Sequence, residues 1–180
     1  MSSLGMAFSF FFMEKSLVLD KQKVEHILER MAYEIYENNF EEKEIFIAGI
    51  YDKGYLLASL LKEKLEKISP IKAHLIKVSL DKFAPQQSEV SLDFDVEQVT
   101  NKAILLVDDV MNSGRTMAYS LKPFFQINIK KIHTAVMVDR AHKKFPIKAD
   151  LVGYALATTL KDTIDVEFDE AGNISGVYMI

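Results

Sequence analysis

The stretch AILLVDDVMNSGRT, residues 103–116, carries the strongest indication of the fold in this sequence. Five apolar residues, Ala103–Val107, predict a buried strand, and two adjacent carboxylates, Asp108 and Asp109, follow at its end. A short run of small and polar residues comes next, and a helical pattern then continues to about Phe125. Because ligands in open α/β sheets lie at the carboxyl ends of the strands, this arrangement predicts a binding site rather than a packing feature.

The residues after the two acids have the composition of a phosphate-binding loop. Small residues allow successive backbone N–H groups to turn towards an anion, and the following helix N-terminus adds partial positive charge. The candidate phosphate ligands are Asn112, Ser113, Gly114, Arg115 and Thr116. Asp108 and Asp109 are unsuited to phosphate but suit sugar hydroxyls, which they contact directly or through Mg²⁺. Together the two parts predict a ribose 5-phosphate site.

A second candidate loop, GIYDKG, spans Gly49–Gly54 and follows the apolar strand Ile45–Ala48. Its two glycines permit close approach of the backbone to an anion, and Lys53 supplies positive charge. A plain strand-to-helix turn is the alternative interpretation. The sequence contains neither the Walker A pattern nor the dinucleotide pattern G-x-G-x-x-G, so neither of those phosphate loops is expected.

The remaining patterns alternate between strands and helices. Asp20 is expected to cap a helix over 21–38, and a second helix ends near Ile68. Strands are predicted at 73–80, 131–139 and 151–153, with a closing hairpin at 166–168 and 177–179; residues 81–99 read as a long loop with strand-like parts. Such alternation predicts an α/β fold with a mostly parallel sheet.

Composition excludes several classes of site. The chain has 180 residues, a net charge of −4 and no cysteine, so disulfides, thiolate metal sites and thiol nucleophiles are excluded and a cytoplasmic protein is expected. The four histidines lack metal-ligand spacing. The apolar start of the chain is too short to span a membrane. We expect residues 1–12 to be a non-native extension from a mis-called start codon, or a disordered one, ahead of a single domain at 13–180. The alternative is an apolar segment that docks on the domain or on a partner.

The acid pair and its loop resemble the phosphoribosyl pyrophosphate (PRPP) signature of type I phosphoribosyltransferases, and GIYDKG resembles that family's pyrophosphate loop. VDRAHKKFPIKADLVG, residues 138–153, is similar to a segment of the bifunctional pyrimidine operon regulators that are also uracil phosphoribosyltransferases, and residues 16–38 resemble their first helix. The resemblance implies the type I phosphoribosyltransferase fold, a central mostly parallel sheet flanked by helices, with a small hood from about 140–180. It also implies a homodimer or a dimer of dimers.

The resemblance implies transfer of phosphoribose from PRPP to uracil with Mg²⁺, giving UMP and pyrophosphate. Asp108 and Asp109 would be the catalytic pair and contact the metal through the substrate, and Asn112–Thr116 would bind the 5-phosphate. Pyrophosphate would be held by Tyr51, Asp52, Lys53 and Gly54. The base would lie against Val138, Asp139, Arg140, Ala157 and Thr158.

Two departures from the family leave the acceptor base open. The flexible loop has Lys82 where relatives carry a Tyr-Arg-Asp-Asp-like run, and the hood has Ala157-Thr158-Thr159 in place of Pro-Thr-Ser. A purine or another base therefore stays an alternative acceptor. A nucleotide- or RNA-sensing regulator with vestigial catalysis is a further alternative from another class.

Residues 130–148 hold six basic side chains and a single carboxylate, Asp139. This segment predicts either a solvated basic surface or a surface that binds the leader of a pyrimidine-operon mRNA. The candidate RNA contacts are Arg30, His142, Lys143 and Lys148. Lysines replace several arginines of the family here, and lysine lacks the fork that reads bases in a bidentate manner.

Overall fold

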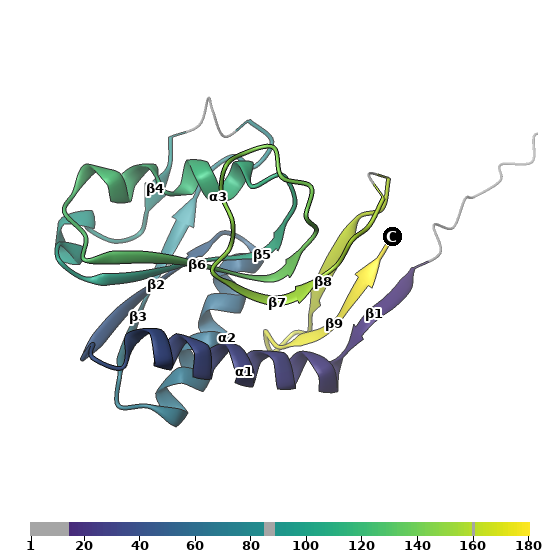
Figure 1. The fold of residues 1–180 in the computed structure, drawn as a ribbon, viewed down its shortest axis with the longest axis horizontal. Helices are drawn as coiled ribbons and strands as arrows, with labels where there is room; N and C mark the ends of the chain where they lie inside the picture. The colour runs from purple at the N-terminus through teal and green to yellow at the C-terminus, as the bar shows by residue number, and fades with distance from the viewer. Residues whose placement is uncertain (1–14, 85–88, 160) are drawn as a thin grey trace, which may run out of the picture.

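A six-stranded sheet runs through the middle of the protein (Figure 1). The structure is a computed structural model that describes residues 15–84, 89–159 and 161–180. The strands of this sheet are β2 (Glu44–Ile50), β3 (Lys72–Ser79), β4 (Ser91–Leu92), β5 (Ala103–Met111), β6 (Lys131–Asp139) and β7 (Leu151–Ala155). Their order is β4-β3-β2-β5-β6-β7, and all neighbours are parallel except β4 and β3. The expected α/β fold with a mostly parallel sheet is confirmed.

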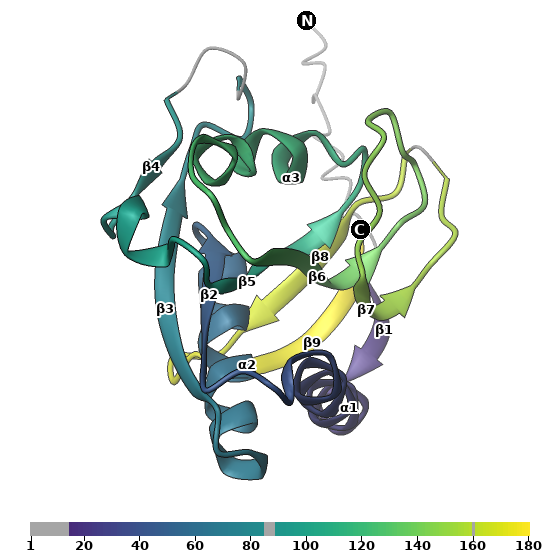
Figure 2. The same ribbon diagram turned by 60° about the vertical axis from the view of Figure 1, so that its left-hand side comes forward.

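Helices cover both faces of this sheet (Figures 1 and 2). On one side lie α1 (Lys21–Asn39) and α2 (Lys53–Ile68), and on the other lies the short α3 (Arg115–Ser120) with the 3₁₀ turns η1 (Val96–Val99) and η2 (Lys122–Gln126). The carboxylate of Asp20 accepts a hydrogen bond from the backbone N–H of Lys23, which confirms the expected cap. No helix in the described ranges is long and apolar enough to cross a membrane.

A second sheet of three strands packs on the α1 side of the large sheet. It consists of β1 (Ser16–Asp20), β8 (Ile164–Phe168) and β9 (Ile174–Met179), in the antiparallel order β1-β9-β8. The hairpin of β8 and β9 was expected, although both strands are longer than predicted. The strand β1 was not expected, because five residues show no clear alternation and their partner, β9, lies at the other end of the chain.

Several boundaries near the two candidate loops differ from the sequence-based expectation. The helix after the acid pair ends at Ser120 instead of about Phe125, because Pro123 has no N–H to donate and the chain continues as the 3₁₀ turn η2. β5 runs on to Met111, so the two acids lie within a strand and not after it. Likewise β2 runs to Ile50 and α2 starts at Lys53, which shortens the loop between them.

The apolar core forms two clusters, one on each face of the large sheet. Buried side chains of α1, α2 and the small sheet make up the first cluster, and those of α3, η1 and η2 contribute to the second. β5 contributes alternate residues to both, with Leu105 in the first and Leu106 in the second. The strand that carries the acid pair is therefore held on both faces.

Candidate functional site

Both candidate loops lie at the carboxyl ends of neighbouring strands. β2 and β5 are parallel partners, with Gly49 opposite Val107, so the loop after β2 lies beside the acid pair. The approach is close, because a Cβ on Gly54 would come within 2.9 Å of Asp108 Cα. A Cβ on Gly49 would come within 2.4 Å of Tyr55 Cα, so glycine at this position lets α2 start directly against the strand.

The acid pair contains one buried and one half-buried carboxylate. The side chain of Asp108 is 6 % exposed, and its Oδ1 accepts a hydrogen bond from the backbone N–H of Asp109 at 3.0 Å. Lys82 Nζ lies 3.1 Å from Asp108 Oδ1 and 3.9 Å from Asp109 Oδ1. Burial, together with the neighbouring charge of Asp109, raises the pKa of Asp108 to about 7, and the ammonium of Lys82 opposes this shift.

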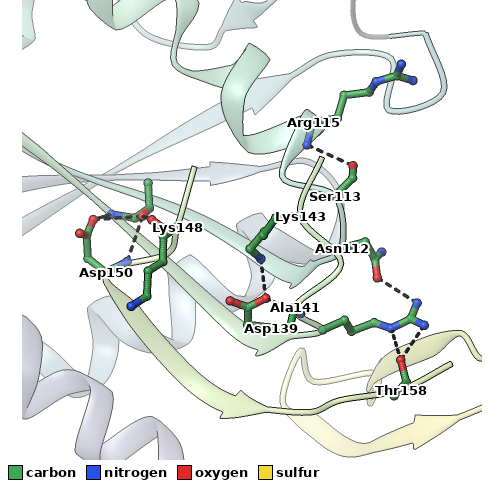
Figure 3. Close-up of polar contacts among 11 residues, drawn as sticks. Asn112, Ser113, Arg115, Asp139, Ala141, Lys143, Lys148, Asp150 and Thr158 are labelled. Carbon is green, nitrogen blue, oxygen red and sulfur yellow. Dashed lines mark hydrogen bonds and ion pairs between the residues drawn. The ribbon is translucent and has the colours of Figure 1, made fainter. Parts of the chain in front are cut away.

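A cavity of about 220 Å³ lies between Asp108 and the loop that follows the acid pair. It is lined by Lys82, Asp108 and residues 110–117. Gly114 has a φ of 81°, a left-handed conformation that glycine adopts without strain, and it starts α3. The hydroxyl of Ser113 accepts a hydrogen bond from the backbone N–H of Arg115 at 3.3 Å, as Figure 3 shows. All five residues expected to bind phosphate line this one cavity.

The candidate pyrophosphate loop is short and its lysine is paired. Tyr51 and Asp52 are exposed and are joined by a cis peptide bond, while Lys53 is the first residue of α2. Lys53 forms an ion pair with Asp165 on β8 of the small sheet. No motif drew attention to Asp165 in the sequence, because the contact joins residues that are far apart in the chain.

Of the residues expected near the base, Arg140 contacts Thr158 just after the end of β6, whereas Ala157 is exposed. Val138 is buried in the core, so its side chain is unavailable to a ligand. The carboxylate of Asp139 pairs with Lys143 (Figure 3). Arg140 is buried and donates hydrogen bonds to Asn112, Thr158 and Thr159.

The basic segment does not form the continuous surface that its sequence suggested. Lys130 and Lys131 lie at the start of β6 and pair with Glu42, at the opposite edge of the sheet from the acid pair. Lys143 is paired and Arg140 is buried, as described above. Arg30 donates to the backbone oxygens of Val152 and Gly153 on the edge strand β7 and pairs with Glu34. Lys144 and Lys148 are exposed.

Comparison with known proteins places this geometry in a family. The family model described as the phosphoribosyl transferase domain matches residues 16–170. The chain belongs to the type I phosphoribosyltransferase family. Among curated relatives, the bifunctional protein PyrR of Macrococcus caseolyticus is 31% identical over 174 residues, covering 93% of this chain and 99% of the relative. PyrR of Clostridium kluyveri is also 31% identical, over 169 residues, covering 91% of this chain and 96% of the relative.

Solved phosphoribosyltransferase structures share the fold. A hypoxanthine-guanine phosphoribosyltransferase of Bacillus anthracis superposes with a TM-score of 0.71 at 17% identity, covering 90% of this chain and 96% of that one. The hypoxanthine phosphoribosyltransferase of Trypanosoma cruzi gives a TM-score of 0.68 at 13% identity, covering 78% and 81%. At these identities the likeness shows the phosphoribosyltransferase fold and leaves the acceptor base open.

The acid pair of this phosphoribosyltransferase suits an ion brought by the substrate. Among the described residues, no group of three or more His, Asp or Glu side chains is placed to hold a metal ion. Mg²⁺ is commonly bound by one or two carboxylates while substrate phosphates and water supply its other ligands. Two adjacent carboxylates beside a phosphate-sized cavity fit that pattern.

The raised pKa of Asp108 predicts a pH-dependent stability. Between the ordinary pKa of 3.8 and the folded pKa of about 7, the folded state keeps a proton that the unfolded state has lost, so unfolding becomes easier as the pH rises through this window. Asp108→Asn removes the ionisation. We therefore expect the melting temperature of Asp108→Asn, relative to that of the parent, to be higher at pH 8 than at pH 5.

Thermal denaturation followed by circular dichroism checks this expectation. Glu37→Gln, an exposed substitution on α1, serves as the control and should give the same difference from the parent at both pH values. An equal effect of Asp108→Asn at the two pH values would contradict the raised pKa.

Proposed function

We propose that the protein transfers the phosphoribosyl group of PRPP to uracil, giving UMP and pyrophosphate in the presence of Mg²⁺. The observation that carries the proposal is the meeting of three parts at one edge of the sheet: the acid pair, the cavity behind it and the short loop before α2. These are the parts needed to hold a sugar, its 5-phosphate and a leaving pyrophosphate side by side.

Each part of the donor has a proposed binding group. The backbone N–H groups and hydroxyls of Asn112–Thr116 bind the 5-phosphate, and Asp108 and Asp109 accept hydrogen bonds from the ribose hydroxyls. Tyr51–Gly54 hold the pyrophosphate, with Lys53 as its cation. When bound, Mg²⁺ would neutralise part of the pyrophosphate charge next to the two carboxylates.

The chemistry needs positioning and charge stabilisation more than acid–base catalysis. In the reaction the bond from the anomeric carbon to pyrophosphate breaks while the bond to the base nitrogen forms, and that nitrogen loses its proton to solvent or to the leaving pyrophosphate. Positive charge develops on the ribose ring as the bond to pyrophosphate breaks. Ionised Asp108 and Asp109 lie where they can stabilise that charge. Lys82, which contacts both carboxylates here, has to release them before the ribose hydroxyls can bind.

Uracil is the acceptor favoured by the chain's likeness to the PyrR proteins, which are about 31% identical over nearly its whole length. The hood residues leave a purine as the alternative, since Ala157, Thr158 and Thr159 depart from the family pattern. We propose that the base lies beside Thr158 and the backbone at the end of β6.

Binding of pyrimidine-operon leader RNA is a second proposal, carried by the name of the relatives as bifunctional proteins. Of the candidate contacts, Lys148 is exposed and His142 is half-buried, whereas Arg30 and Lys143 are used in contacts within the chain. We expect an electrophoretic shift with leader RNA that weakens in Lys144→Glu/Lys148→Glu, since reversing two exposed positive charges repels the phosphates. No shift with the parent protein would refute this proposal.

Incubation with PRPP, Mg²⁺ and a panel of uracil, cytosine, hypoxanthine, guanine and adenine tests the acceptor. We expect UMP as the main product and no comparable nucleotide from the purines. Product identity is read by chromatography and mass spectrometry. Formation of IMP or GMP at a higher rate than UMP would replace uracil by a purine as the substrate.

The double variant Asp108→Asn/Asp109→Asn should lose at least about 10³-fold in turnover, because the developing positive charge then has no carboxylate beside it. At pH 8 the melting temperature of the double variant should stay at or above that of the parent. The parent is destabilised at this pH because Asp108, whose pKa is raised in the folded state, has lost its proton. Glu37→Gln/Glu41→Gln, at two exposed positions at the end of α1 and just after it, is a charge-matched control. Turnover close to that of the parent in the double variant would contradict the assignment.

Asp165→Asn should lower the KM for PRPP, because it frees Lys53 from its ion pair and removes a negative charge near the pyrophosphate. Lys53 and Asp165 are each about one-third exposed, so the effect should not exceed about fivefold, the scale of a surface ion pair. Steady-state kinetics with varied PRPP measures it. Glu167→Gln, two residues along β8 and paired with Lys15, is the matched control and should change KM less. An increased KM in Asp165→Asn would show that the ion pair positions Lys53 instead of competing for it.

A further inference from the structure

Residues 140–147, which we call the strap, lie across the phosphate-binding loop between β6 and β7 (Figure 3). The backbone N–H groups of Lys144 and Phe145 donate to the carbonyl oxygen of Ser113 at 2.9 and 3.1 Å. The guanidinium of Arg115 lies 5.8 Å from the ring centre of Phe145. The strap thus holds the loop from outside at several successive residues.

Glycine at position 114 is also required by the strap. A Cβ on Gly114 would come within 2.6 Å of Ile147 Cγ2, so the strap packs directly against the backbone of the loop. The strap and the phosphate-binding loop both border the proposed donor site. Because they pack together, we expect them to move as one unit.

Arg140, at the start of the strap, extends the connection to the loop after β7. Its backbone N–H donates to Met111 O at 3.0 Å, and its Nη1 donates to Asn112 Oδ1 at 2.9 Å. On the other side Nε and Nη2 donate to Thr158 Oγ1 at 2.9 and 2.7 Å, and Nη2 also donates to Thr159 O at 2.9 Å. One buried guanidinium joins a phosphate-loop residue to two residues on the base side.

This guanidinium is fixed by its surroundings. Arg140 is 7 % exposed, and four hydrogen bonds to protein oxygens leave little of its five-donor fork for a ligand. Thr159 is itself held, because its N–H and hydroxyl both donate to Asp162, at 2.8 and 2.9 Å. A movement of Asn112 is therefore expected to move Thr158 and Thr159 as well, because the hydrogen bonds of Arg140 that connect them cannot easily be replaced by others.

We propose that Arg140 is a positioning residue that couples occupancy of the 5-phosphate site to the conformation of residues 154–159, the base-side loop. The proposal rests on the proposed function, because it takes Asn112–Thr116 as the phosphate site. Phosphate binding fixes the position of the Asn112 side chain, which in turn fixes the guanidinium of Arg140. The guanidinium then holds Thr158 and Thr159 in place beside the base. By linkage, a base bound there strengthens phosphate binding by the same factor. Lysine cannot replace arginine, since an ammonium lacks the planar fork that reaches both sides.

Hydrogen–deuterium exchange of the full chain, with and without ribose 5-phosphate, tests the coupling without a base. In the parent we expect ribose 5-phosphate to slow exchange both at 112–116 and at 154–159. In Arg140→Met and Arg140→Lys we expect protection at 112–116 to persist and protection at 154–159 to be lost. Lys144→Met, an exposed change in the same strap, should behave like the parent.

Thr158→Val covers the case in which the buried Arg140 variants fail to fold. It removes the acceptor on the base side and leaves the phosphate loop untouched, so it should bind ribose 5-phosphate with an affinity within about fivefold of the parent, the lower end of measurable coupling, and lose protection at 154–159. A merely structural role would lower the melting temperature and leave the ligand-dependent protection in place.

The outcomes separate the inference from the proposed function. Equal protection of 154–159 in the parent, in Thr158→Val and in the folded Arg140 variants would overturn the coupling while the phosphate site stands. Ribose 5-phosphate that binds the parent but leaves 154–159 unprotected would overturn it too. Failure of the parent to bind ribose 5-phosphate at all, measured by calorimetry, would overturn the donor site and the coupling together.

Discussion

The arrangement of this site depends on a carboxylate held inside a sheet. Asp108 lies within β5, a central strand, with its side chain almost completely buried and Lys82 as its nearest cation. Burying a charge is costly unless it is paired, so the carboxylate needs either a proton, the ammonium of Lys82 or a ligand. In the proposed reaction, ribose hydroxyls and an accompanying cation would replace Lys82, and this would link the segment that carries Lys82 to donor binding.

The sequence predicts the fold, and it predicts which residues meet at the candidate site, because the signals for both are local. The apolar run before Asp108, the small residues up to Gly114 and the two glycines around Lys53 each occupy a few consecutive positions. Their neighbours in space follow from the rule that parallel strands bring their carboxyl ends together. The roles of these residues stay predictions until the variants are measured.

What could not be predicted are the contacts between distant segments. The basic run 130–148 suggests one continuous surface. In the structure β6 separates Lys130 and Lys131, at its amino end, from the basic residues after its carboxyl end. Arg140 is buried, where it donates hydrogen bonds to Asn112 and Thr158. Arg30 donates hydrogen bonds to backbone oxygens of the edge strand β7. No sequence pattern within α1 indicates this contact. The positive charge of these residues thus suggested an exposed binding surface, whereas several of their side chains form hydrogen bonds within the chain.

The pairing of β1 with β9 has a consequence for synthesis of the chain. Ser16 lies opposite Met179, so the small sheet cannot close until β9 has left the ribosome. Asp165, which holds Lys53, belongs to that sheet. The strands of the large sheet are synthesised before β8, but Lys53 acquires its partner only once β8 has been made. A nascent chain truncated before β8 would therefore contain the acid pair and residues 112–116 without the ion pair that holds Lys53.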